Sequence, residues 1–151
     1  MGIFDKDLEL SDAQSLANKA NGAKTVSTVT IDLTGGAALK DGWGNIITYN
    51  AFEGRRMKWN LNVNAALVGA GAALLCTLVT KAVGTAMASG ATELARVTIP
   101  AASAAGTKFS IGLPTTASLR YLAAVYTVSG GTLASAKLDS WIGIDHDTPS
   151  P

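Results

Sequence analysis

The sequence predicts an all-β domain, a β-sandwich or jelly roll, on three observations. Apolar and polar residues alternate with a period of two along several segments, which is the pattern of a half-buried strand. Turn residues separate these segments at intervals of about ten residues, as in sandwiches and jelly rolls. The chain has 151 residues, the length of one ordinary domain with its own core. We therefore predict a single β-sandwich domain over residues 1–151.

The first expected strands lie at 28–33 and 59–64. In 28–33, TVTIDL, three apolar residues alternate with polar ones before a pair of glycines. In 59–64, WNLNVN, the same period places three apolar side chains on one face and three asparagines on the other. A leucine-rich stretch at 74–80 follows Gly69-Ala70-Gly71, which permits a turn with positive φ. We expect 59–64 and 74–80 to pair as a hairpin.

The second half of the chain predicts four further strands, at 92–99, 109–113, 119–128 and 134–144. Both faces of 119–128 are apolar, which is typical of a central strand covered on two sides. The sequence SGGT that follows it indicates a hairpin turn. Arg120 has two open interpretations, an ion pair with Asp139 or a contact with a partner chain.

The N-terminal residues 1–24 are expected to form a short arm, and residues 146–151 a C-terminal tail. Within the arm, SDAQSLANKA at 11–20 favours a helix, with Ser11 and Asp12 as possible caps. Residues 40–58, KDGWGNIITYNAFEGRRMK, have loop character and are rich in aromatic residues. We interpret them as an irregular inserted loop segment.

The run from Trp59 to Thr80 contains no charged residue and is long enough to span a membrane as a helix. The alternating asparagines and the absence of basic and aromatic flanks favour strands instead. The acidic N-terminus lacks the pattern of a secretory signal. We therefore expect no membrane contact and synthesis in the cytoplasm. The single cysteine, Cys76, is expected to be a small buried hydrophobic residue.

Charge is sparse and unevenly distributed. Charged residues make up 15% of the chain, against about a quarter in typical soluble domains. Residues 59–151 hold only 9 of the 23 charged residues, and the net charge is +1. Such a chain has no field to attract nucleic acid. The composition indicates a protein whose surface is covered in an assembly, and a plain, sparsely charged β domain is the alternative.

Several short fragments occur in order over most of the chain: LSDAQSL at 10–16, TVST at 25–28, IDL at 31–33, LP at 113–114, LRYL at 119–122 and VSGG at 128–131. Together they resemble the cement, or decoration, proteins of tailed-bacteriophage capsids. The segment at 40–58 departs from the pattern of that family.

The resemblance implies a jelly-roll structural protein of the virion that binds the outer surface of the phage head. Its partners would be the major capsid protein and itself, as a homodimer or homotrimer, without nucleic acid or membrane. It would clamp neighbouring capsid subunits against the internal pressure of packaged DNA, and the resemblance implies no enzymatic activity.

Two segments are candidates for contact with the capsid, because aromatic and arginine residues are the usual anchors of interfaces. The loop segment and the strand after it supply Trp43, Tyr49, Phe52, Arg55, Arg56 and Trp59. The arm supplies apolar groups that need a partner, namely Ile3, Phe4, Leu8 and Leu10. The alternative is that the aromatic residues cap an open end of the sandwich.

Catalysis and metal binding find little support. His146 is the only histidine, and in Asp145-His146-Asp147 adjacent side chains of an extended chain point to opposite sides. A hydrolytic triad would need that histidine held rigidly, and a terminal tail does not provide this. We expect no catalytic residue, metal or cofactor. The alternative function is a carbohydrate-binding β-sandwich on a phage or cell surface, in which Trp43 and Trp59 would stack on sugar rings.

Overall fold

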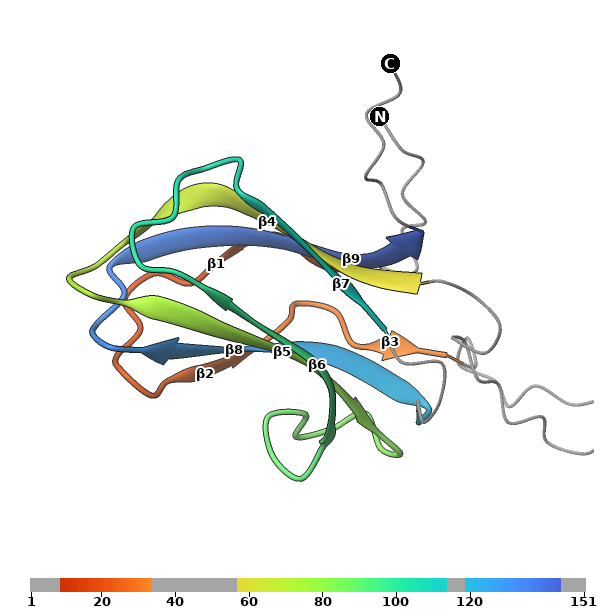
Figure 1. Ribbon diagram of the computed structural model, residues 1–151. Coiled ribbons are helices and arrows are strands. Elements are labelled where there is room, and N and C mark those ends of the chain that lie inside the picture. Colours follow the sequence, from red (N-terminus) through yellow and green to blue (C-terminus); the bar gives the residue numbers. More distant parts are fainter. Residues whose placement is uncertain (1–8, 34–56, 114–118, 145–151) are drawn as a thin grey trace, which may run out of the picture.

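The computed structural model describes residues 9–33, 57–113 and 119–144, and it confirms an all-β fold (Figure 1). Two antiparallel sheets pack face to face as a β-sandwich, and the described residues contain no helix. The strands are β1 (Glu9–Ser15), β2 (Lys24–Val26), β3 (Ile31–Asp32), β4 (Met57–Val68), β5 (Ala73–Lys81), β6 (Thr92–Ile99), β7 (Lys108–Gly112), β8 (Tyr121–Ser129) and β9 (Ser135–Ile144).

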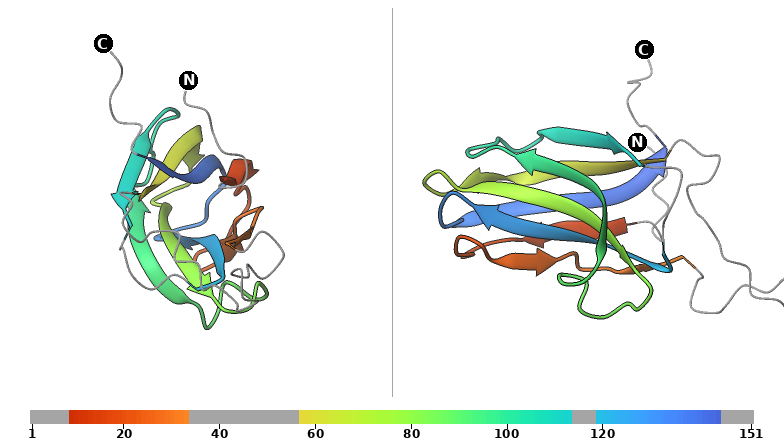
Figure 2. Two further views of the ribbon diagram at one scale, coloured as in Figure 1. Left: turned by 90° about the vertical axis from the view of Figure 1, so that its right-hand side faces the viewer. Right: turned by 60° about the horizontal axis from the view of Figure 1, so that its bottom comes forward.

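The strands pair in a nested order. The innermost pair is β5 with β6, followed outward by β4 with β7, then β2 and β3 with β8, and finally β1 with β9. This long nested hairpin is rolled up, so that β9 also pairs with β4 and β8 with β5. The result is a four-stranded sheet in the order β1-β9-β4-β7 and a five-stranded sheet in the order β2-β8-β5-β6, with β3 on β8 (Figure 2).

The core lies between the two sheets and follows the predicted period of two. On β4, Trp59, Leu61 and Val63 are fully buried, and the asparagines of the same strand lie on the opposite face. Leucines of β5, in the facing sheet, and Leu138 of β9, the neighbouring strand of the same sheet, join them in the core. Burial of each large apolar side chain contributes roughly 1.5–3 kcal/mol. The prediction of the inward face from the sequence of 59–64 is therefore confirmed.

Strand β8 is buried on both faces, as its sequence predicts. One face contributes to the main core, and the other carries Ala123 and Val125, which form a second small cluster with Val79 of β5. The loop 82–91, between β5 and β6, covers this cluster with the buried side chain of Met87. The five-stranded sheet thus has a covered outer face where the loop folds back over it.

The predicted helix at 11–20 is wrong. Residues 9–15 form β1, an edge strand of the four-stranded sheet, and Leu10 and Leu16 are fully buried in the core. Caps at Ser11 and Asp12 would be local signals of modest energy, and burial of two leucines outweighs them. These residues therefore belong to the sandwich rather than to a separate arm.

The predicted strand at 28–33 is shorter than expected, because only Ile31–Asp32 form a ladder. Upstream of it, the hydroxyl of Ser27 donates to Val29 O at 2.8 Å and accepts from Ala124 N at 3.0 Å. A side chain that bonds to the local main chain in this way competes with regular strand pairing. The interruption separates β2 from β3.

The two predicted hairpin turns, at 69–71 and 129–132, are instead crossings between the sheets. Strand β4 lies in one sheet and β5 in the other, and the same is true of β9 and β8. The two turns pack main chain against main chain. A Cβ on Gly130 would lie 2.5 Å from the carbonyl oxygen of Gly71. A Cβ on Gly131 would collide with the carbonyl oxygen of Ala70. Glycine is required at these positions because no side chain fits between the turns.

None of the described residues forms a helix of the length and apolar character that crossing a lipid bilayer requires.

Candidate interaction surface

Two of the predicted partner-contacting residues lie in the core. Leu10 and Trp59 are fully buried, and the indole N–H of Trp59 donates to Ser140 Oγ at 2.8 Å. Neither side chain is available at the surface, which corrects the prediction for these two residues and removes Trp59 as a sugar-stacking group. The other candidates lie outside the described residues: Ile3, Phe4, Leu8, Trp43, Tyr49, Phe52, Arg55 and Arg56, together with His146.

Polar side chains inside the sandwich are occupied with one another. The hydroxyl of Tyr126 shares a hydrogen bond with Ser11 Oγ at 2.9 Å, and Ser11 donates to Gln14 Oε1 at 2.6 Å. Gln14 in turn donates to Val26 O at 2.8 Å and so joins β1 to the five-stranded sheet. Burial raises the pKa of Tyr126, and its side-chain hydrogen bonds oppose this rise. The network holds the two sheets together, and its polar groups are used in hydrogen bonds within the chain.

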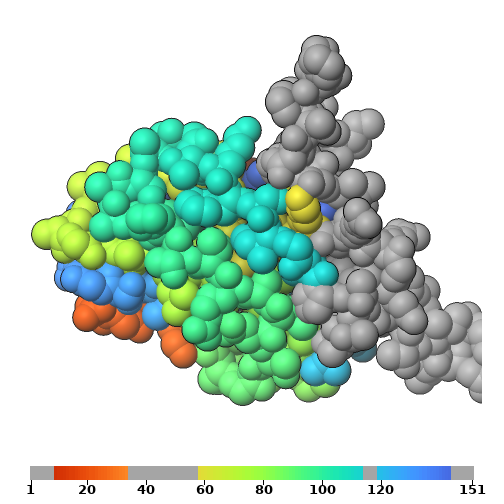
Figure 3. Space-filling view, viewed as in Figure 1, coloured from red at the N-terminus to blue at the C-terminus, as the bar shows by residue number. Residues whose placement is uncertain are grey.

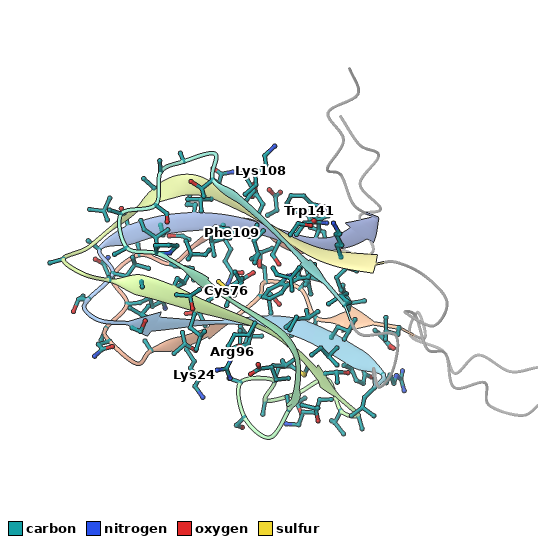
Figure 4. The ribbon with its side chains drawn as sticks, in the orientation of Figure 1. Lys24, Cys76, Arg96, Lys108, Phe109 and Trp141 are labelled. Carbon is teal, nitrogen blue, oxygen red and sulfur yellow. The ribbon has the colours of Figure 1, made fainter. Side chains whose placement is uncertain are left out.

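Cys76 lies between the sheets (Figure 4), buried and without a disulfide. Burial raises the pKa of its thiol well above the usual range, which keeps the thiol protonated. Because the thiolate is the reactive form, this residue acts as a small hydrophobic group, as predicted.

The outer face of the four-stranded sheet carries the asparagines of β4 opposite polar residues of β9 and β7. Trp141 of β9 lies opposite Asn60 on this side (Figure 4). Asn60 Oδ1 accepts from Ser110 Oγ at 2.8 Å. Asp139 accepts from the main-chain N–H of Ala13 at 2.7 Å and from Asn62 at 3.0 Å. These polar groups therefore fasten the four strands to one another across the sheet.

Two amide atoms of this face lack such a bond. Asn60 Nδ2 and Asn62 Oδ1 are buried and have no hydrogen-bond partner within the described part of the chain. The Asn60 nitrogen and the Trp141 indole both lie within 3.8 Å of the point that a Cβ on Gly143 would occupy. The Asn60 amide is therefore buried in the neighbourhood of the indole ring.

A different surface forms at the end of the sandwich where the chain crosses between the sheets. It consists of residues 66–72, 100–107 and 129–134, which we call the uncharged end because their sequences contain no charged residue. Lys19, which pairs with Leu133, borders this surface. Figure 3 shows these loops gathered at the left, in yellow-green, green-teal and blue. Its exposed residues are alanine, glycine, threonine and proline, together with Val68, which is 52% exposed.

Main-chain hydrogen bonds hold the three loops of the uncharged end together. Leu67 N donates to Ser103 O at 3.0 Å, and Ala134 N donates to Val68 O at 2.7 Å. Ala102 adopts φ +58°, a left-handed conformation that costs a residue with a Cβ of the order of 1 kcal/mol. The surface is therefore a fixed arrangement of small side chains and accessible main chain.

The sequence revealed part of this surface. AASAAG at 101–106 is recognisable as a loop of small residues, and charge is scarce throughout 59–151. The assembly of three such loops at one end depends on strand crossings that no local pattern specifies.

No family model matches the sequence, and no curated protein matches it. Among the residues that the structure describes, no three histidine, cysteine, aspartate or glutamate side chains come together as a metal site. The fold and surface define a β-sandwich with an uncharged, shape-fixed end.

Proposed function

We propose that this chain is a structural virion protein, a capsid cement protein that binds the outer surface of a phage head. It clamps neighbouring major capsid protein subunits against the pressure of packaged DNA. The observation that carries the proposal is the uncharged end. Its small residues allow a partner's main chain to approach closely, and its three loops carry no charge of their own that would have to be desolvated when they are covered.

The strand order supports a jelly roll as the finer description of the fold, which is the fold that the sequence resemblance implies. If β2 and β3 are one interrupted strand, the sandwich has eight strands. Their nested pairs are rolled into two four-stranded sheets, in the orders β1-β9-β4-β7 and β2-β8-β5-β6. An eight-stranded double sheet wound from a nested hairpin is the arrangement of a jelly roll.

The proposed action is thermodynamic. A protein that binds the assembled shell, and not its separated subunits, lowers the free energy of the assembled state by mass action. Rigid loops suit this role, because a surface that is already ordered loses little conformational entropy on binding. The three interlinked loops of the uncharged end meet this requirement.

Carbohydrate binding is the second candidate, favoured by one observation. Trp141 is partly exposed beside Asn60, Asn62 and Asp139, and an aromatic ring near amides and a carboxylate suits sugar recognition. The hydrogen bonds of Asp139 and Asn60 within the sheet weigh against it, because they leave few polar groups for a ligand.

Sedimentation tests the proposal. The full-length protein should co-sediment with empty heads of the phage that encodes it, and not with polysaccharide. Val68→Glu and Ala105→Glu, both at the uncharged end, should lower head occupancy by about tenfold or more, because a buried unpaired carboxylate is costly. Thr98→Glu, on the exposed outer face of β6, is the matched control and should bind as wild type does. A wild-type protein that sediments with polysaccharide and ignores heads would establish the second candidate instead.

A further inference from the structure

The far end of the five-stranded sheet carries a second surface of different chemistry. The β5–β8 ladder ends with Lys81 opposite Tyr121. Val83 and Leu119 each lie two residues beyond this pair and are 58% and 45% exposed. Leu119 N donates to Thr80 Oγ1 at 2.7 Å, which holds its backbone against the end of β5. Two of the four exposed large hydrophobic residues in the described chain thus lie at one end of one ladder.

The aromatic ring between them is fixed in place. The main chain of Gly84 packs directly on Tyr121, since a Cβ there would approach two ring carbons to 2.9 Å. The guanidinium of Arg120 lies 5.0 Å from the centre of the same ring. Arg120 also donates to both carboxylate oxygens of Asp32, at 3.0 and 2.9 Å. This answers the open question about Arg120, whose intramolecular partner is Asp32 and not Asp139.

The loop that carries Val83 is also held firmly. Lys81 Nζ donates to the carbonyl oxygens of Thr85, Ala86 and Ser89 at 3.0–3.2 Å. Met87 anchors the same loop from below, in the small cluster on β5 and β8. The ammonium charge of Lys81 is therefore directed into the loop, and Val83 is presented from a fixed support.

We name these residues the Tyr121 patch: Asp32, Val83, Gly84, Leu119, Arg120 and Tyr121. We propose that the Tyr121 patch is where two copies of this chain associate about a two-fold axis. Its composition fits, because tyrosine and arginine are enriched in the buried centres of interfaces and homodimer interfaces are the more apolar class. Its pre-ordered ring and guanidinium would lose little freedom on association.

The charges of the Tyr121 patch select a second copy as the occupant. In a two-fold interface the same surface meets itself, so a patch of one sign would repel its own copy. Arg120 and Asp32 lie side by side with opposite signs and side chains 39% and 21% exposed. Across a two-fold axis, Arg120 of each copy can therefore face Asp32 of the other. The net charge of +1 adds little long-range repulsion. This inference goes beyond capsid binding and does not depend on it.

The first test is the mass of the purified full-length chain in solution, by size exclusion with light scattering over a dilution series. Wild type should have the mass of a dimer. Leu119→Asp should raise the dimer dissociation constant by about tenfold or more, because it would bury an unpaired carboxylate. Val68→Asp, an exposed valine at the uncharged end, is the matched control and should remain dimeric. A wild-type monomer at every concentration, or a Leu119→Asp variant that is as dimeric as wild type, would overturn the proposal.

The second test separates association from folding. Asp32→Arg leaves two positive groups in the patch and Arg120→Asp leaves two negative groups, so each variant alone should be monomeric. Mixed in equal amounts, they should form a heterodimer, which native mass spectrometry identifies by its mass. Circular dichroism confirms that each variant is folded before mixing. Folded variants that each dimerise alone, or that remain monomers when mixed, would show that these charges do not face each other across an interface.

Discussion

Replacing Tyr126 by Phe removes one buried hydroxyl, and it should lower the free energy of unfolding near pH 7 but leave it almost unchanged near pH 11. Near pH 7 the variant loses the 2.9 Å hydrogen bond to Ser11 Oγ. Ser11 keeps its bond to Gln14 Oε1, and Ser140, the other side-chain neighbour of this hydroxyl, still accepts from the Trp59 indole, so both keep a hydrogen-bond partner. We therefore expect a loss of about 1 kcal/mol in the free energy of unfolding, the usual net value of one buried hydrogen bond.

At alkaline pH the buried hydroxyl destabilises the folded state relative to the unfolded state. Burial raises the pKa of Tyr126 in the folded state above the value of 10.0 for an exposed tyrosine. Above pH 10 the unfolded chain therefore loses this proton while the folded chain keeps it, and stability falls as pH rises. Below pH 10 the hydroxyl stays protonated in both states, and its contribution to the free energy of unfolding is retained. At pH 11 the free energy of unfolding has fallen by about 1.4 kcal/mol. Because phenylalanine does not titrate, the two proteins should be about equally stable near pH 11.

The assay is chemical denaturation of both proteins at pH 7, 9, 10 and 11, followed by tryptophan fluorescence. The thiol of Cys76 has a raised pKa of the same sign, and it is present in both proteins, so the difference between them isolates Tyr126. A stability difference that stays constant from pH 7 to pH 11 would refute the reasoning, because it would mean that Tyr126 titrates equally in both states.

Three further substitutions, one of them with a matched control, test the packing. Gly131→Ala should lower the free energy of unfolding by about 3 kcal/mol, because its Cβ would collide with the opposing turn. The control Gly22→Ala, at φ +82° with nothing within 4 Å of its Cβ, should lower it by about 1 kcal/mol. Equal losses in urea denaturation would contradict the packing of one turn on the other. Met87→Ala should lower the free energy of unfolding by about 2 kcal/mol and increase the rate of proteolysis within 82–91. An unchanged digestion rate would show that Met87 does not anchor the loop. Asp139→Ala should lower the free energy of unfolding by about 2 kcal/mol, since the part-buried donors Ala13 N and Asn62 Nδ2 lose their acceptor, and an unchanged midpoint of thermal unfolding would count against that role.

The elements whose signal is local could be predicted from the sequence. The alternation of 59–64 identified the buried face of β4, because side-chain direction in a strand depends only on the position of the residue. The two apolar faces of 119–128 likewise identified a strand covered on both sides. Strand β6 was predicted with the bounds that the structure shows, since a proline ends it and both of its faces have a clear character.

Pairing could not be predicted in the same way. Gly69-Ala70-Gly71 and Gly130-Gly131 are strong turn signals, but a turn sequence does not say whether the next strand joins the same sheet or crosses to the other one. The helix expected at 11–20 failed because the capping signal is local, whereas the burial of Leu10 depends on β9, more than 120 residues away in the chain. The error at Trp59 is of another kind: period two places it on the same buried face as Leu61, and its predicted role at the surface ran against that pattern.

The two proposed surfaces lie at opposite ends of β5, whose nine residues span about 26 Å. A dimer joined at the Tyr121 patch carries one uncharged end at each extremity, and it engages two sites on a shell at once where both ends face the same side of the dimer. Linked binding of this kind can exceed the affinity of one site by roughly 10²–10⁴ without a new contact. Leu119→Asp, which should be monomeric, would then bind heads at least about a hundredfold more weakly than wild type, although its uncharged end is intact. Head binding equal to that of wild type would mean that the two ends do not act together.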